Sequence, residues 1–291
     1  MARRVHGAPA VDWIGAYLLE DLGPGDITTD ALFEPAATGS ARIVARARTV
    51  VAGGQHAAEV FRRLGATAEQ VVQDGKWADA GATVLRVTGP TRAILSGERL
   101  ALNVVGRMSG IATLTRECVE VLAKACATTM VAGTRKTTPG FRAFEKEAIA
   151  TGGGERHRMG LWDEAMLKDN HLEAWAGRGL AKAAAADVGR AVARVVAANP
   201  LRVVCCEVES LAHAQAAADA GAAWLLIDNQ PPATGEAWAR EVRLRHPAVR
   251  VEASGGITPA TVGAFGWADR VSLGWLTQKA QAADMSMEWG A

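Results

Sequence analysis

The stretch LRVVCCEVESLAHAQAAADAGAAWLLIDN (Leu201–Asn229) contains one pattern twice: a short apolar run that ends at a carboxylate. The first run ends at Glu207 and the second at Asp228, and an alanine-rich segment of helix length lies between them. Strand-length apolar runs that alternate with helix-length segments are typical of βα units on a parallel sheet. This stretch therefore predicts an α/β fold in which the two carboxylates end consecutive strands.

The same alternation extends over the chain after residue 126. Six strand-length runs occur there: TTMVAG (128–133), EAMLKD (164–169), LRVVCCEV (201–208), AAWLLID (222–228), VRVEAS (249–254) and RVSLG (270–274). At or near the end of each run stands a polar residue or glycine, in order Arg135, Lys168, Glu207, Asp228, Ser254 and Gly274. Active sites of α/β barrels lie at this end of the strands, so one shared mouth is predicted. Six strands are fewer than a complete barrel has, which predicts an incomplete or modified barrel.

The first part of the chain has a different pattern. Strands are predicted within 40–53 and 83–89, with a helix at 56–64 between them and a long helix over 91–125 after them. An N-terminal helix over 11–22 ends where the sequence GPGD supplies glycine and proline. These elements indicate a separate α+β unit.

The composition is that of an ordinary globular protein of 291 residues, with 49% hydrophobic and 22% charged residues. A net charge of +1 gives no general attraction to nucleic acid or to membrane surfaces. No window approaches the roughly 18 consecutive apolar residues of a membrane span, and the first ten residues lack a secretory apolar core. We expect a cytoplasmic protein whose four cysteines are free thiols.

Cations gather at the early strand ends of the predicted mouth. They are Arg135, Lys136, His157, Arg158 and Lys168. Arginine forks and lysine point charges together would bind an anion that carries several carboxylates or phosphates. The alternative is solvated loop charge, but the glycines of GGGERHRMG (152–160) allow this charged segment to approach a ligand closely.

Carboxylates and glycine-rich turns follow the later strands. Glu207 and Asp228 are costly to bury unpaired, so they are expected to meet a cation, a metal or sugar hydroxyls, or to form structural ion pairs. The Ser254-Gly255-Gly256 turn and Gly274 precede predicted helix starts, where backbone N–H groups suit a phosphate. Tight turns are the alternative for each. The ligand so described resembles that of a phosphoribosyl transfer reaction.

Longer motifs make the resemblance specific. They are EDLGPGDITTD (20–30), GERLALNVVGRMSGIATLT (97–115), GTRKTTPGFRAFEKEAIATGGGERHRMGL (133–161), LKDNHL (167–172), CEVES (206–210), LLIDN (225–229), EASGGI (252–257) and SLGWLTQKAQAADMSM (272–287). In this order they cover nearly the whole chain, which resembles the quinolinate phosphoribosyltransferases. The resemblance implies an N-terminal α/β sandwich domain with a long connecting helix (1–125), an α/β barrel (126–275) and a C-terminal segment (276–291) that packs back on the first domain.

The resemblance also implies roles for individual residues. Glu207 and Asp228 match carboxylates around the ribose and its magnesium, and Lys136 matches a lysine near both substrates, so these three are the expected catalytic residues. The expected substrate-binding residues are Arg99, Arg135, Thr137, His157, Arg158, Lys168, Ser254, Gly255, Gly256 and Gly274. Arg99 matches an arginine that enters the site of a neighbouring subunit. A homo-oligomer with shared sites, a dimer or a hexamer, is therefore expected.

The implied reaction joins quinolinate to phosphoribosyl pyrophosphate (PRPP) and releases pyrophosphate and carbon dioxide, giving nicotinate mononucleotide. Mg²⁺ is the implied cofactor, carried with PRPP near Glu207 and Asp228, and no residue is firmly assigned as its ligand. Arg156 and Trp275 depart from the commonest motif, as do Gly133 and Gln278. The alternatives are a paralogue that acts on another pyridine or aromatic carboxylate, and a catalytically silent barrel that binds a phosphorylated metabolite.

Two further cations stand beside the opening loop of the barrel. Arg142 and Lys146 follow Pro139-Gly140 at a spacing of one helical turn. We expect both to lie on the surface of a helix, and Arg135 and Lys136 to bind substrate.

Overall fold

The computed structural model describes residues 11–125, 127–177 and 184–290. Two expectations, that Cys126 is a free thiol and that the first ten residues lack a secretory apolar core, concern residues outside this part of the chain. Contacts divide the protein into two compact units, Met1–Thr113 with Gln281–Ala291, and Leu114–Ala280. Among the helices of the described residues, none is both long and apolar enough to span a membrane.

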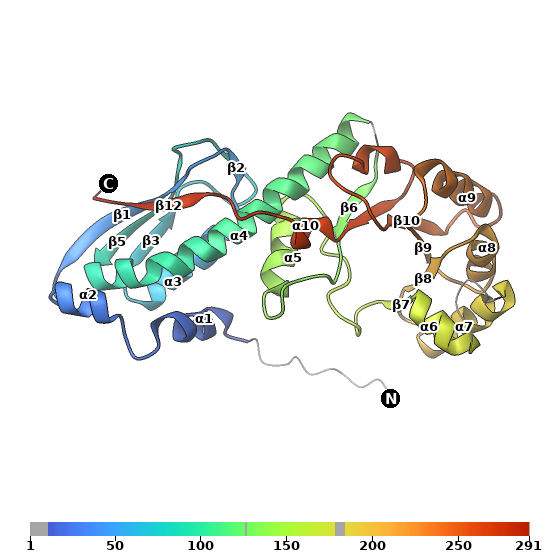
Figure 1. Ribbon diagram of the computed structural model, residues 1–291, viewed down its shortest axis with the longest axis horizontal. Helices are drawn as coiled ribbons and strands as arrows, with labels where there is room; N and C mark the ends of the chain where they lie inside the picture. Colours follow the sequence, from blue (N-terminus) through green and yellow to red (C-terminus); the bar gives the residue numbers. More distant parts are fainter. Residues whose placement is uncertain (1–10, 126, 178–183, 291) are drawn as a thin grey trace. The chain divides into compact units, whose positions relative to one another are not determined.

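The first unit is built on an antiparallel sheet in the order β12-β1-β5-β3 (Figure 1). Its strands are β1 (Thr38–Ala45), β3 (Thr67–Gln70), β5 (Thr83–Pro90) and β12 (Met285–Trp289). A short pair, β2 (Thr49–Val50) and β4 (Trp77–Ala78), and the helices α1 (Trp13–Leu22), α2 (Ile27–Leu32) and α3 (Gly54–Arg63) complete it. The α+β arrangement predicted for this part of the chain is confirmed.

Strand β12 comes from the far end of the sequence and was not among the predicted strands. It pairs with β1 over Ala41 to Ala45 (Figure 1). Arg42 Nε donates to Glu288 Oε2 at 2.9 Å across that pair. Its first four residues are half-buried and Trp289 is exposed, so no alternation of buried and exposed positions marks this strand. Pairing with a strand more than 240 residues away is a long-range contact that no local pattern reveals.

The long helix α4 (Thr91–Lys124) contains two glycines, Gly106 and Gly110, in the segment GRMSG (106–110). The helix continues through this segment without a break. At this point the chain leading to β12 crosses the helix: Ala283 N donates to Gly106 O at 2.8 Å. A Cβ on Gly110 would lie 1.9 Å from the carbonyl oxygen of Gln281. The glycines therefore serve close packing of two backbones and do not interrupt the helix.

The second unit contains a six-stranded parallel sheet in the order β6-β11-β10-β9-β8-β7. The strands are β6 (Met130–Gly133), β7 (Ala165–Leu167), β8 (Val204–Val208), β9 (Trp224–Asp228), β10 (Arg250–Ser254) and β11 (Arg270–Leu273). The helices are α5 (Arg142–Thr151), α6 (Asp169–Ala176), α7 (Ala185–Ala198), α8 (Leu211–Asp219), α9 (Pro232–Arg245), the 3₁₀ helix η2 (Val262–Phe265) and α10 (Trp275–Gln278). All six predicted strands are present, and the modified α/β barrel is confirmed.

The two faces of this sheet differ because side chains alternate along each strand. One face packs on helices α6 to α9 and buries residues such as Cys206, Leu225 and Val251 (Figure 1). The other face carries Cys205 and Leu226 and packs on Met130 and Met166. Cys118, Cys205 and Cys206 are buried free thiols, as predicted for them. On the second face, polar residues replace the apolar ones at the carboxyl ends of the strands.

Candidate active site

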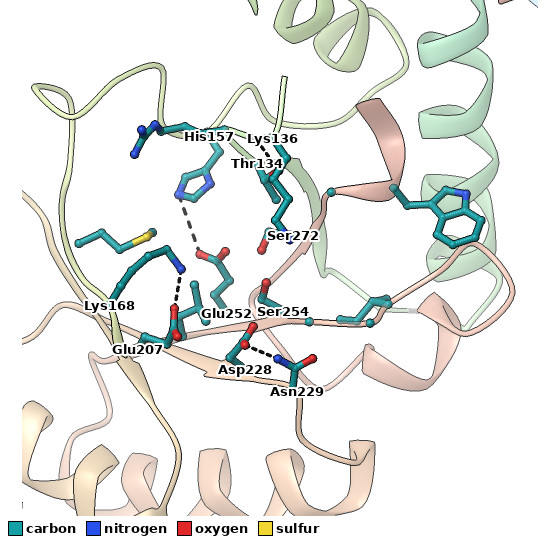
Figure 2. Close-up of a pocket in the computed structure, with 18 of the residues that line it drawn as sticks. Thr134, Lys136, His157, Lys168, Glu207, Asp228, Asn229, Glu252, Ser254 and Ser272 are labelled. Atoms are coloured by element: carbon teal, nitrogen blue, oxygen red, sulfur yellow. Dashed lines mark hydrogen bonds and ion pairs between the residues drawn. The ribbon is translucent and has the colours of Figure 1, made fainter. Parts of the chain in front are cut away.

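A pocket of about 600 Å³ lies at the carboxyl ends of the parallel strands (Figure 2). Every strand of the sheet contributes, either from its last residues or from the loop that follows it. The predicted site residues that line it are Arg135, Lys136, His157, Arg158, Lys168, Glu207, Asp228, Ser254, Gly255, Gly256 and Gly274. The shared pocket predicted from the strand ends is therefore present.

One wall of the pocket carries cationic side chains, and some of their buried nitrogens lack hydrogen-bond partners among the described residues. Arg158 is buried, and burial, followed by repulsion from Arg135, lowers the pKa of its guanidinium. Its Nε has no hydrogen-bond partner in the described part of the chain, and neither ring nitrogen of His157 has one. Buried polar atoms without partners are uncommon in folded proteins and cost about 1–3 kcal/mol each. This wall is therefore suited to an anion that supplies the missing acceptors.

His157 is held in an unusual backbone conformation, with φ of 52°. Its imidazole points into the pocket toward Glu252, with Nε2 at 3.9 Å from Glu252 Oε2 (Figure 2). The same nitrogen lies 3.4 Å from Glu164 Oε2. A left-handed conformation costs a residue with a side chain about 1–2 kcal/mol, so surrounding contacts must maintain it.

The floor contains a buried ion pair. Arg270 donates from Nε and Nη2 to Glu252 Oε2 at 3.0 and 2.5 Å, and its guanidinium lies 3.9 Å from the ring centre of Trp224. Glu252 also lines the pocket. Because Arg270 already compensates Glu252, this carboxylate adds little free negative charge to the site.

The opposite wall carries the strand-end carboxylates. Lys168 Nζ lies 2.5 Å from Glu207 Oε2, so the cationic wall and the carboxylates meet at this bond (Figure 2). Burial raises the pKa of Glu207 and Lys168 offsets only part of that effect. For half-exposed Lys168, burial lowers the pKa but attraction to Glu207 outweighs it, and the pKa is raised.

Asp228 is tied to its neighbour. Asn229 donates from Nδ2 to Asp228 Oδ2 (Figure 2), and Asn229 itself has a left-handed backbone with φ of 54°. The turn at Gly255 packs directly against Asn229: a Cβ on Gly255 would lie 2.6 Å from Asn229 N, at a φ of 85°. Only glycine fits here, so the turn brings backbone close to Asp228.

Two predicted residues are placed elsewhere. Arg99 lies on α4 in the first unit, where it lines a different cavity of about 300 Å³ with Asp26 and Ser96. Thr137 does not line the pocket; its hydroxyl accepts a hydrogen bond from Arg142 Nε at 2.9 Å. Thr137 thus orients the loop that carries Arg135.

The expectation for Lys146 is wrong. Lys146 is completely buried within α5, whereas Arg142 is half-buried. Helical spacing could not reveal this, because the covering segment is the loop at 156–159 and comes later in the chain.

Several lining residues were not predicted. They include Thr134, Met166, Asp169, Leu226, Asn229, Glu252, Ile257, Thr258 and Ser272. Alternation along the strands could have indicated some of them, because Glu252 and Ser272 stand two residues before Ser254 and Gly274 on the same strand face. The turn residues gave no such signal.

The carboxylates suit a metal that arrives with a ligand. Among the described residues there is no group of three or more His, Cys, Asp or Glu side chains that could hold a metal by itself. Asp169, Glu207 and Asp228 nevertheless line the pocket. Mg²⁺ in phosphate sites commonly uses one or two carboxylates with phosphate oxygens and water. The donor set therefore fits Mg²⁺ bound to a phosphorylated substrate.

Fold and site define the class: an α/β protein with a barrel-like sheet whose pocket joins a cationic wall to carboxylates and glycine-rich turns. Two family models match the chain, "Quinolinate phosphoribosyl transferase, N-terminal domain" over residues 26–109 and "Quinolinate phosphoribosyl transferase, C-terminal domain" over residues 111–288. The chain belongs to the quinolinate phosphoribosyl transferase family.

Named relatives agree along nearly the full length. The chain is 39% identical to the Homo sapiens nicotinate-nucleotide pyrophosphorylase (carboxylating), with 94% of this chain and 90% of that protein covered. It is 36% identical to the Bacillus subtilis protein named probable nicotinate-nucleotide pyrophosphorylase (carboxylating), with the same coverage of both chains. The NadC structure from Streptococcus pyogenes has a TM-score of 0.85 at 36% identity, covering 95% of this chain and 94% of that one.

Proposed function

We propose that this protein is a pentosyl-group glycosyltransferase that joins quinolinate to PRPP with decarboxylation, the step that yields nicotinate mononucleotide in de novo NAD biosynthesis. The observation that carries the proposal is one pocket in which a cationic wall faces carboxylates and glycine-rich turns, and in which buried nitrogens of Arg158 and His157 lack hydrogen-bond partners among the described residues. The carboxylating relatives support this reaction. They give no support to another acid substrate or to a silent barrel.

Quinolinate would bind at the cationic wall. Its two carboxylates would accept from Arg135, Arg158 and His157, and buried nitrogens of the last two lack partners among the described residues. Lys168 is half-exposed and has ammonium hydrogens beyond the one given to Glu207, so it can also reach the acid. Each carboxylate lost from the substrate would leave buried cations unpaired, which explains selection of a diacid.

PRPP would bind along the opposite wall. The Ser254 to Gly256 turn and Gly274 would receive the 5-phosphate with backbone N–H groups, because Gly255 and Gly256 carry no side chain and hold left-handed backbone conformations. Glu207 and Asp228 would lie beside the ribose. Mg²⁺, held with the pyrophosphate by water and by Asp228 or Asp169, would neutralise the leaving group.

Transfer breaks the bond from the anomeric carbon to the pyrophosphate oxygen and forms a bond to the pyridine nitrogen. Positive charge develops on the ribose during this displacement, and the anionic Glu207 and Asp228 would stabilise it. Lys136, an exposed residue of the pocket lining, would contact the departing or incoming anion. The ribosylated nitrogen is then cationic and accepts the electron pair released when the 2-carboxylate leaves as carbon dioxide. A proton replaces that carboxylate on the ring.

The assembly is proposed to be a homo-oligomer with shared sites in the cytoplasm, either a dimer or a hexamer. Support comes from the family resemblance of the GER segment that contains Arg99. Within its own unit Arg99 lines a separate cavity. Mixing an Arg99→Ala protein with a Glu207→Ala protein tests sharing, because hybrid dimers would contain one intact site. Recovered activity supports sharing, and no recovery despite demonstrated subunit exchange contradicts it.

The reaction is tested with purified protein, Mg²⁺, quinolinate and PRPP, by following pyrophosphate and carbon dioxide together. Equal amounts of both products are expected, and neither when one substrate is omitted. A panel with nicotinate and other pyridine dicarboxylates gives the specificity, and quinolinate is expected to have the highest kcat/KM. Absence of turnover by folded, pure protein would overturn the proposal.

A further inference from the structure

Helix α5 contains a lysine that the reaction above does not use. The Lys146 ammonium is completely buried and donates to two backbone carbonyls, Gly133 O at 3.1 Å and Arg156 O at 2.5 Å. No carboxylate within the described residues forms an ion pair with it. A fully buried charge held only by carbonyls is unusual, since buried charges are normally paired.

The cost of this arrangement is visible in the ionisation of the side chain. Burial, followed by repulsion from Arg142, lowers the Lys146 pKa to about 8, although Glu252 and Asp163 act in the other direction. An apolar side chain of similar length would fill the same space without that cost. Packing alone therefore does not account for a lysine at this position.

The two carbonyls belong to two separate arms of the pocket. Gly133 ends β6, and the residues after it include Arg135 and Lys136. Arg156 immediately precedes His157, and its carbonyl is part of the peptide that leads into the left-handed φ of 52°. One ammonium thus joins the start of the first arm to the start of the second.

Neighbouring side chains of α5 make parallel connections. Arg142 donates from Nε to the Thr137 hydroxyl at 2.9 Å and from Nη1 to Met159 O at 3.1 Å, which also joins the two arms. Glu145 is buried and accepts from Thr138 N and from the Thr138 hydroxyl, both at 3.0 Å. The helix therefore contacts both arms through side chains that do not line the pocket.

We propose that Lys146 is a positioning residue that sets the separation of the Arg135–Lys136 arm and the His157–Arg158 arm, so that both arms engage one diacid. This inference rests on the proposed function of the same pocket. Lys146 does not line the pocket, so it acts through the peptides it binds. A diacid needs its two binding groups at a fixed spacing, and a small misplacement of one arm reduces binding strongly.

The matched variants differ in donors but little in length. Lys146→Met removes both hydrogen bonds and the charge, while Lys146→Gln keeps two N–H donors without charge. Arg116→Met is the control, because Arg116 donates to Gly152 O at 2.9 Å at the opposite end of α5 and does not line the pocket. All are compared with the unaltered protein as full-length chains.

For Lys146→Met, the KM for quinolinate should rise on the order of 10- to 100-fold, with the KM for PRPP unchanged within about twofold. Lys146→Gln should recover most of the loss, and Arg116→Met should leave both KM values unaltered. Quinolinate binding to the unaltered protein and to each folded variant is measured by calorimetry, and Lys146→Gln carries the same test if the methionine variant does not fold. Unaltered quinolinate affinity in a folded variant, or equal changes in both KM values, overturns the positioning role. Loss of turnover in the unaltered protein overturns the proposed function instead, and the two failures are thus distinct.

Discussion

The Lys168 ammonium lies 2.5 Å from the Glu207 carboxylate, and this contact joins the cationic wall of the pocket to the carboxylate wall. The residues come from two adjacent parallel strands, β7 and β8, whose carboxyl ends meet at one edge of the sheet. Lys168 therefore serves both sides: it can bind an acid with its free hydrogens while it holds Glu207 in place.

Replacing Glu207 by glutamine should separate these functions. The variant loses the negative charge beside the developing positive charge, so kcat should fall about 100-fold or more, while quinolinate KM changes little. Steady-state kinetics for both substrates provide the measurement. Exposed Glu209, two residues later and outside the pocket lining, is the control as Glu209→Gln. A similar loss in both variants would mean that the charge of Glu207 has no specific role.

Arg158→Lys keeps the positive charge but removes the planar fork. Because Arg158 Nε is buried without a partner in the described part of the chain, we expect it to bind substrate, and the loss should cost about 2–5 kcal/mol in kcat/KM for quinolinate. PRPP binding, measured by calorimetry in the same protein, should stay unchanged. Undiminished kcat/KM for quinolinate would place Arg158 outside the acid site.

The two glycines of the Ser254 to Gly256 turn should differ in how well they tolerate replacement by alanine. Gly255→Ala places a Cβ 2.6 Å from the Asn229 backbone nitrogen, so the turn must move and PRPP affinity should fall strongly. Gly256→Ala meets only Asn229 Oδ1, at 3.9 Å, and should cost no more than the roughly 1–2 kcal/mol of a left-handed alanine. Thermal unfolding and PRPP titration of both variants measure the difference. Equal behaviour of the two would contradict the close packing on Asn229.

The buried ion pair beneath the pocket should contribute more to stability than an exposed pair of the same unit. Glu252→Gln removes the nearer charged partner of buried Arg270 and leaves only Glu155, at 3.9 Å, so it should lower the free energy of unfolding by about 3–5 kcal/mol. Arg243→Met breaks a more exposed pair with Asp269 and should cost only about 0–1 kcal/mol. Urea unfolding at neutral pH compares them. Comparable losses would show that burial does not decide the strength of these pairs.

Lys146 should make stability depend on alkaline pH. Its pKa is lowered from 10.5 to about 8, so between these values the unfolded chain holds more protons than the folded one. Stability therefore rises with pH in this window, relative to Lys146→Met, by at most about 3 kcal/mol. Arg142 and Arg270 face Lys146 and lower its pKa, whereas Glu252 and Asp163 raise it. Unfolding free energies at pH 7 and pH 10 for both proteins test this, and a constant difference between them would exclude a titrating Lys146.

Local patterns in the sequence are sufficient for the parallel sheet and for most of the pocket. Apolar runs separated by helix-length segments determine the βα order, and parallel strands bring their carboxyl ends together. Lys168, Glu207 and Asp228 are therefore placed in one pocket by the sequence alone. Strand alternation also carries a signal for Glu252 and Ser272, which share a strand face with Ser254 and Gly274.

Tertiary structure alone decided which charges are free and which are compensated. Lys146 and Arg142 have the same helical spacing as a surface pair, yet the loop at 156–159 covers Lys146 completely. Likewise, the pairing of Glu252 with Arg270 and of β12 with β1 joins segments that sequence spacing does not relate. Composition and periodicity determine which side chains face the core or the strand ends. Burial and partners depend on which distant segments pack over them, and these settle the ionisation and the function of each charge.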